Sequence, residues 1–174
     1  KRQKTLWSEQ EAQSVMRPLM ESVDVLFANE EDIEKSLGLR AADSDVVSGK
    51  LSVAGYSALM GRLAGEFGFK AVAVSLRESL SASDNNWSAL LYSGGEVYES
   101  KKYGIHIVDR VGGGDSFASG MIYAMLNDYA PQDAVEFAVA ASCLKHSIEY
   151  DFNLSTPEEV LALARGDGSG RISR

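Results

Sequence analysis

Apolar residues along the chain occur alternately at helical spacing and in short continuous runs, which predicts alternating helices and strands. A capping-box pattern that starts at Ser8 predicts a first helix, which ends near Glu21. The apolar run 23–28 predicts a strand. Asn29 then provides a helix-start signal for a second helix that ends near Gly38.

The middle of the chain shows the same alternation. Apolar residues at helical spacing predict a helix over 53–67, and the continuous run 71–76 predicts a buried strand. The segment 79–88 is mostly polar and is expected to be a loop. Two β-favouring segments flank the sequence Gly94-Gly95, which is typical of the turn of a β-hairpin.

The last third begins with a predicted strand over 105–108 and a run of glycines. Apolar patterns predict helices over 115–126 and 131–146, and Thr156 begins a final helix. This alternation, with a hairpin inserted, predicts an α/β fold with a mostly parallel sheet and helices on both faces. We expect residues 1–174 to form a single domain.

Composition narrows the class of protein. With 174 residues, of which 45% are hydrophobic, the chain can bury a substantial core. A net charge of -8 argues against nucleic-acid binding as the main task, which needs a clustered basic surface. The single cysteine, Cys143, suits a reducing compartment, and no apolar stretch approaches the roughly 20 residues of a membrane span. We therefore expect a cytoplasmic protein without nucleic-acid or membrane partners. The sequence starts inside a predicted element, so we expect it to belong to a longer polypeptide.

The most informative segment joins a predicted strand to a helix through Gly112, Gly113, Gly114 and Asp115. The start of a helix presents unpaired amides and the positive end of the helix dipole, which together favour an anion. Glycines allow a phosphate to approach the backbone closely. We therefore expect valine at Gly113 to hinder phosphate approach while leaving the fold largely intact.

Asp115 stands at the start of this helix, where its ionised carboxylate is stabilised and can accept a proton from a substrate hydroxyl. A base beside an anion hole suits phosphoryl transfer. Taken alone, the local sequence is also compatible with a flexible turn followed by Asp115 as a simple helix cap, and it leaves several kinds of anion site open. The segment is neither a P-loop nor a dinucleotide fingerprint, because no Lys-Ser/Thr follows the glycines and Phe117 replaces the third glycine.

The wider sequence resembles a known family. Asp109, Gly112–Gly114, Asp115 and Phe117 match the C-terminal signature of the ribokinase/PfkB carbohydrate kinases. With residues 75–79 and 140–148, the chain resembles 2-keto-3-deoxygluconate kinases in particular. The resemblance implies a ribokinase-like three-layer sandwich. It also implies that these 174 residues are its C-terminal, ATP-binding and catalytic portion, without the N-terminal sugar-binding and lid part.

The resemblance assigns roles to the glycine segment. Asp115 corresponds to the catalytic base, which also contacts the substrate. Gly112, Gly113 and Gly114 correspond to the anion hole, and Gly112 and Gly114 also contact ATP. Asp109 corresponds to a residue beside a monovalent-cation site. The threonines usual after it are replaced by Arg110 and Val111, so a monovalent cation is doubtful here.

Other residues are assigned to ATP and magnesium by the same resemblance. Ser75, Arg77 and Ser79 lie at the strand end where related kinases contact ATP, with Arg77 in place of a common glycine. Asn29 and Asp32 match a motif that positions Mg²⁺ and phosphates indirectly, through water, which suits an ion that keeps several waters. Asn29 can also be explained as a helix cap, and the two roles are compatible.

Asp151 and Arg2 are the remaining substrate candidates. Asp151 matches an aspartate that contacts the sugar acid, although Glu149 and Tyr150 replace the turn-forming residues expected before it. Arg2 resembles an arginine that meets the substrate carboxylate, with a spacing one residue too long.

The sequence thus predicts ATP- and Mg²⁺-dependent phosphorylation of 2-keto-3-deoxygluconate to its 6-phosphate, with Asp115 as general base. Two alternatives stay open: a kinase for another sugar such as fructose, and a nucleotide-binding fragment without activity of its own. By resemblance, we expect the full-length protein to form a homo-oligomer.

Overall fold

The computed structural model of the protein describes residues 7–41 and 52–166. They form an α/β arrangement that divides into two compact units, one of Lys1–Val74 with Tyr92–Val97 and one of Ser75–Leu91 with Tyr98–Arg174. Within the described ranges, no helix has the length and apolar character needed to cross a membrane.

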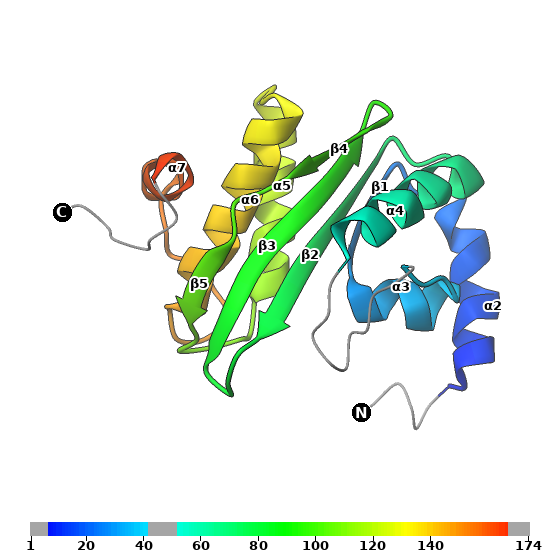
Figure 1. Cartoon of the computed structure of the whole chain (residues 1–174), viewed down its shortest axis with the longest axis horizontal. Helices are drawn as coiled ribbons and strands as arrows, with labels where there is room; N and C mark the ends of the chain where they lie inside the picture. The colour runs from blue at the N-terminus through cyan, green and yellow to red at the C-terminus, as the bar shows by residue number, and fades with distance from the viewer. Residues whose placement is uncertain (1–6, 42–51, 167–174) are drawn as a thin grey trace. The chain divides into compact units, whose positions relative to one another are not determined.

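The first unit contains helices and strands whose ends follow the predicted capping signals. It comprises α2 (Glu9–Met20), β1 (Val25–Asn29), α3 (Glu30–Leu37) and α4 (Val53–Phe67) (Figure 1). Ser8 and Glu11 form a capping box at the start of α2. Helices α3 and α4 end at Gly38 and Gly68, whose φ angles of 72° and 78° are left-handed and favour glycine. The predicted ends of the three helices are confirmed, whereas β1 begins two residues after the predicted start.

The predicted polar loop over 79–88 is wrong. Strand β2 (Ala71–Ser79) and strand β3 (Asp84–Ser93) form a hairpin through this segment (Figure 1). The amide of Leu80 donates to the Asp84 carbonyl at 3.0 Å, and the hydroxyl of Ser81 donates to the Asp84 carboxylate at 2.7 Å. Asn85 and Trp87 are both buried on β3. The segment is mostly polar, but these two buried positions are separated by one residue, as in a strand.

The Gly94-Gly95 hairpin is confirmed between β3 and β4 (Glu96–Glu99), and both glycines have positive φ angles. Strand β5 (Tyr103–His106) starts two residues before the expected strand and pairs antiparallel with β3, with Tyr103 opposite Trp87. The strand order is β1-β2-β3-β4, with β5 also on β3. The α/β class is therefore confirmed, and the sheet is mixed because its hairpins are antiparallel.

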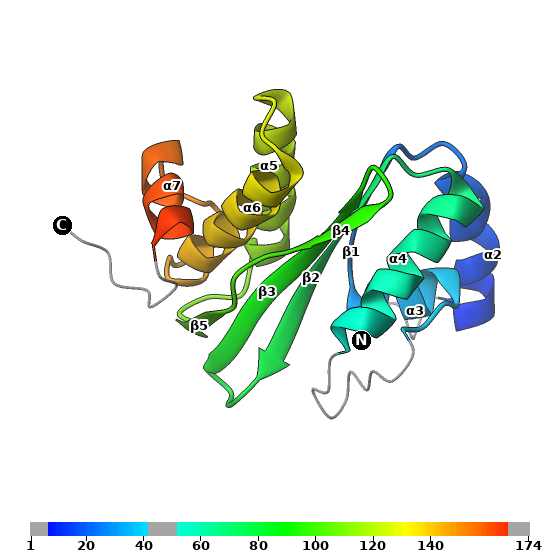
Figure 2. The ribbon, with the colours of Figure 1, turned by 45° about the horizontal axis from the view of Figure 1, so that its top comes forward.

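Three helices complete the second unit: α5 (Gly113–Leu126), α6 (Pro131–His146) and α7 (Pro157–Arg165). Figures 1 and 2 both show α5 and α6 side by side. Gly120 permits this close approach, because a Cβ there would lie 3.0 Å from the Cα of Ala138. Helix α5 begins two residues earlier than expected, so Gly113 and Gly114 belong to its first turn.

Candidate functional site

The glycine segment forms the start of α5. Gly112 is the N-cap residue, with a left-handed φ of 79° and no side chain to cap the helix. The Gly113 amide donates to the Arg110 carbonyl at 3.3 Å, and the Ser116 amide donates to the Gly112 carbonyl at 2.8 Å. By helix geometry, the amides of Gly114 and Asp115 lack intrahelical acceptors. This end of α5 therefore has the backbone geometry that suits an anion.

The three glycines have different surroundings. A Cβ on Gly112 would overlap the carbonyl oxygen of Asp151, and a Cβ on Gly113 would lie 2.6 Å from the His146 ring. A Cβ on Gly114 would meet no atom within 4 Å, and Gly114 is exposed. Protein packing therefore explains Gly112 and Gly113, whereas Gly114 is the glycine that leaves space open to solvent.

The His146 contact contradicts the expectation that valine at Gly113 would leave the fold largely intact. His146 is buried, its Nδ1 lies 2.7 Å from the Ser142 carbonyl oxygen, and its ring centroid lies 4.7 Å from that of Trp87. A ring held on two sides cannot move aside for a valine side chain. Substitution at Gly113 should disturb packing as well as phosphate approach.

The second unit contains a cavity of about 530 Å³ beside the start of α5. The cavity brings together Gly112, Asp115 and Asp151, which sequence reasoning had selected separately. Asp115 is the third residue of α5 and is exposed. Further lining comes from hydroxyl, amide and aromatic side chains of Ser119, Tyr123, Phe137, Phe152, Asn153 and Ser155. The cavity therefore offers two carboxylates, polar hydrogen-bonding groups and apolar walls.

Asp109 connects the glycine segment to the loop that carries Asp151. Its carboxylate accepts hydrogen bonds from the amides of Val111 and Tyr150, each at 3.0 Å. The Val111 amide is the main cause of a lowered pKa for Asp109, and the Tyr150 amide and the charge of Lys145 act in the same direction. Tyr150 has a left-handed φ of 67°, a conformation that glycine adopts more readily. The Asp109 carboxylate thus holds the turn that leads into Asp151.

The end of β2 carries the residues predicted to contact ATP. Ser75, Arg77 and Ser79 alternate along β2, so they share one face of the strand. Ser75 is buried, whereas Arg77 and Ser79 are exposed. The charge of Arg77 contributes to the lowered pKa of His146.

The surroundings of His146 favour its neutral form. Burial is the main cause of its lowered pKa, and the charges of Lys145, Arg110 and Arg77 lower it further. Because the unfolded chain then binds a proton more readily than the folded protein, stability should decrease as pH falls below about 6.5.

We predict that this pH dependence is absent from His146→Gln. Denaturant unfolding of the wild type at pH 7.5 and at pH 5.5 should give a smaller free energy of unfolding at the lower pH. The slope contributed by one histidine cannot exceed about 1.4 kcal/mol per pH unit. The variant should be less stable at pH 7.5 but should lose less stability on acidification. An equal loss in both proteins would contradict the assignment of this pH dependence to His146.

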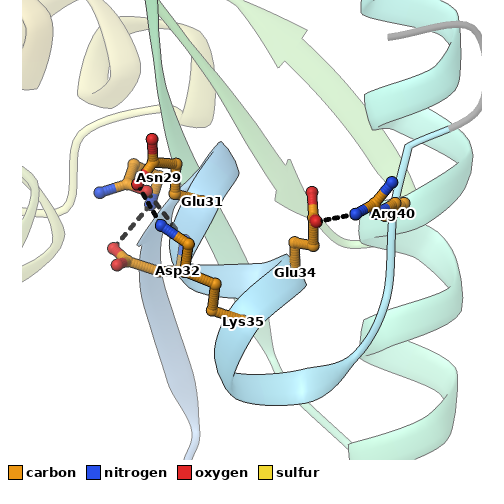
Figure 3. A network of polar contacts seen from close by, with 6 residues as sticks. All are labelled: Asn29, Glu31, Asp32, Glu34, Lys35 and Arg40. Atoms are coloured by element: carbon orange, nitrogen blue, oxygen red, sulfur yellow. Dashed lines mark hydrogen bonds and ion pairs between the residues drawn. The ribbon is translucent and has the colours of Figure 1, made fainter. Parts of the chain in front are cut away.

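Asn29 and Asp32, the magnesium candidates, lie in the first unit and form a helix cap. The Asp32 amide donates to the Asn29 side chain at 2.9 Å, and the Asn29 amide donates to the Asp32 carboxylate at 3.2 Å (Figure 3). Glu31 and Lys35 form an ion pair of 2.6 Å on the same helix. Within 7–41 and 52–166, no three His, Cys, Asp or Glu side chains form a metal-binding group. Arg2 lies outside the described residues.

Sequence reasoning overlooked two groups of residues. Lys145 has an exposed fraction of 0%, and its signal was a charged residue directly after the mostly apolar run 137–144. The cavity residues Tyr123, Phe137 and Asn153 had no such signal, because aromatic and amide side chains in these elements look like ordinary packing residues. Asn153 donates to the Ser116 hydroxyl at 2.6 Å and to the Ala141 carbonyl at 3.0 Å, which joins the Asp151 loop to α5 and α6.

Comparison with known proteins gives consistent matches. The model of the family described as "pfkB family carbohydrate kinase" matches residues 3–148. A 2-dehydro-3-deoxygalactonokinase of Haloferax volcanii is 31% identical over 165 residues, which cover 95% of this chain and 45% of that protein.

Solved structures agree with this match. The crystal structure of 2-dehydro-3-deoxygluconokinase from Thermotoga maritima is 47% identical, with a TM-score of 0.87, over 94% of this chain and 48% of that one. Arabidopsis thaliana ribokinase, complexed with ribose and ATP, is 22% identical, with a TM-score of 0.57, over 86% of this chain and 43% of that one. The latter similarity shows a ribokinase-like fold. The chain spans about half the length of these relatives.

Proposed function

Since this chain belongs to the pfkB family of carbohydrate kinases, we propose that the complete protein phosphorylates 2-keto-3-deoxygluconate at its 6-hydroxyl with ATP. The name 2-dehydro-3-deoxygluconate denotes the same sugar acid. The observation that carries the proposal is the shared cavity of Gly112, Asp115 and Asp151 at the start of α5. It combines a carboxylate that can accept a proton with a helix end that favours an anion.

In the proposed reaction, Asp115 accepts the proton of the substrate's 6-hydroxyl, while the oxygen of that hydroxyl forms a bond to the γ-phosphorus of ATP. The bond between that phosphorus and the β,γ-bridging oxygen breaks, and ADP leaves with the electron pair. The amides at the start of α5 stabilise negative charge on the transferring group.

The nucleotide is proposed to contact Ser75, Arg77 and Ser79, together with the Gly112 and Gly114 backbone. The guanidinium of Arg77 can form two parallel hydrogen bonds to a phosphate. Bound magnesium would neutralise charge on the phosphates. Asn29 and Asp32 are proposed to bind this Mg²⁺ ion only through its water ligands. An ion that keeps several waters does not need a cluster of three carboxylates as direct ligands.

The acceptor sugar is the finer part of the proposal. The relatives act, by their names, on a 3-deoxy gluconate or a 3-deoxy galactonate, which differ in the configuration at C4. The identity of 47% to the gluconokinase favours the gluco form. Asp151 is proposed to bind a hydroxyl of this acceptor, and Arg2 its carboxylate. A cytoplasmic location and a homo-oligomeric assembly are further proposals from the family resemblance.

A substrate panel tests the proposal. The complete protein, with ATP and Mg²⁺, should have its highest kcat/KM with 2-keto-3-deoxygluconate, a lower value with the galacto epimer and little activity with fructose. Preference for fructose would identify another sugar kinase. Nucleotide binding without turnover of any sugar would favour the nucleotide-binding alternative.

We predict that Gly114→Ala separates catalysis from stability. A Cβ at this position meets no protein atom within 4 Å, and alanine is the better helix former, so the free energy of unfolding should stay unchanged or rise by up to about 1 kcal/mol. The added methyl would obstruct phosphate at the anion hole and should lower kcat/KM for ATP at least about 10-fold, or about 1.4 kcal/mol. Steady-state kinetics and thermal unfolding of the same sample measure both effects. Unchanged kinetics would remove Gly114 from the phosphate site.

A further inference from the structure

Lys145 is a charged residue in the interior of the second unit. It lies in the last turn of α6, and its exposed fraction is 0%. Its ammonium donates a hydrogen bond to the Ile148 carbonyl at 3.0 Å. A buried ammonium is costly unless oxygen acceptors and negative charge surround it. We therefore expect Lys145 to have a role that depends on its positive charge and that an apolar side chain could not perform.

Asp109 lies next to this end of α6, because its amide donates to the His146 carbonyl at 3.3 Å. The attraction between Asp109 and Lys145 is one of the interactions that favour the ionised Asp109 carboxylate. That carboxylate holds the Val111 amide on one side and the Tyr150 amide on the other. The same two segments meet again where Gly112 packs against the Asp151 carbonyl. Lys145 thus lies beside a junction of two loops, residues 109–112 and residues 148–151.

A monovalent metal ion does not fit this junction well. The residues after Asp109 are Arg110 and Val111, whose side chains offer no oxygen ligand, and the arginine adds positive charge. The Ile148 carbonyl, an oxygen of the kind that such ions bind, already accepts from Lys145. The positive charge of Lys145 would also repel a further cation.

We propose that Lys145 is a positioning residue that acts as the built-in cation of this junction. Its ammonium holds the 148–151 loop against the 109–112 loop, so that Asp151 and Asp115 keep their places in one cavity without a monovalent metal ion. The catalytic consequence rests on the proposed kinase function. The structural consequence, the attachment of one loop to the other, does not depend on that function.

The catalytic test uses the complete protein. Exchange of potassium for choline chloride at constant ionic strength should leave the wild-type kcat unchanged. Lys145→Met should lower kcat/KM for the sugar acid at least about 10-fold, and ammonium or potassium chloride should restore a large part of it, because a small cation can enter the vacated space. Lys70→Met is the matched control, because this ammonium is exposed and pairs only with Asp24 at 2.8 Å among the interactions of the described residues. Neither its kinetics nor its response to cations should change.

A second readout is independent of activity. Potassium or ammonium chloride should raise the thermal unfolding midpoint of Lys145→Met more than that of the wild type or Lys70→Met, with choline chloride as the reference salt. If Lys145→Met does not fold, Lys145→Gln, which retains a donor for the Ile148 carbonyl, replaces it in both assays. Strong stimulation of the wild type by potassium would overturn the proposal. The proposal would also be overturned if small cations changed neither the stability nor the activity of the Lys145 variants. A wild type without turnover contradicts only the proposed function, because the unfolding measurement still decides the role of Lys145.

Discussion

Asp115→Asn is expected to lower the rate constant for phosphoryl transfer by the complete protein at least about 10²-fold, which corresponds to about 2.7 kcal/mol of transition-state stabilisation. The amide keeps the shape and the hydrogen-bonding reach of the side chain but cannot accept the proton. Asp115 is exposed at the third position of α5, so the fold should tolerate the change. Nucleotide binding should be preserved, because the amides of the helix start remain.

Asp133→Asn is the matched control for this experiment. Asp133 is also exposed and is also the third residue of its helix, α6, so the substitution has the same effect on the helix dipole. Single-turnover kinetics and nucleotide titration of both variants separate the chemical step from binding. If Asp115→Asn turns over at the wild-type rate, or if the two variants lose activity equally, Asp115 is not the general base.

Gly112→Ala is expected to destabilise the protein by about 2 to 5 kcal/mol. A left-handed φ of 79° costs about 1 to 2 kcal/mol for a residue with a Cβ, and the overlap with the Asp151 carbonyl should add about 1 to 3 kcal/mol. Relief of that overlap must move the Asp151 loop away from α5. Molecules that still fold should therefore bind the sugar acid more weakly.

Gly68→Ala is the control that separates the cost of the left-handed φ angle from the cost of the overlap between residue 112 and the Asp151 carbonyl. Gly68 has a φ of 78°, and a Cβ there would meet no atom within 4 Å, so this variant should lose only about 1 to 2 kcal/mol. Denaturant unfolding of both variants gives the comparison. Equal losses at Gly68 and Gly112 would show that the close packing of Gly112 on the Asp151 carbonyl contributes nothing to stability.

Local signals in the sequence were sufficient for most element ends. The Ser8 capping box, the glycines after α3 and α4 and the Gly94-Gly95 turn each depend on hydrogen bonds or backbone angles within a few residues. The hairpin between β2 and β3 was missed, because its buried polar residue Asn85 resembles a loop residue when its neighbours in space are unknown.

The catalytic candidates show the same division. The order of glycines, Asp115 and helix is local, so the sequence alone was enough to identify an anion-favouring helix start with a carboxylate at its third residue. The meeting of Asp115 with Asp151, 36 positions later, depends on the return of the chain through α6. The turn at Tyr150 was unexpected, because its left-handed backbone is supported by the distant Asp109 carboxylate and not by a local glycine.

Periodicity and capping follow from covalent geometry and nearest neighbours, so residue order alone established the α/β class, most helix ends and the carboxylate beside the glycines. The separate reasons for three adjacent glycines could not be read from that order. Gly112 faces the Asp151 carbonyl, Gly113 faces the buried ring of His146, and Gly114 faces open space. Three identical residues have different neighbours because the chain packs other segments against each of them. Steric exclusion acts between atoms that are close in space, whatever their separation along the chain.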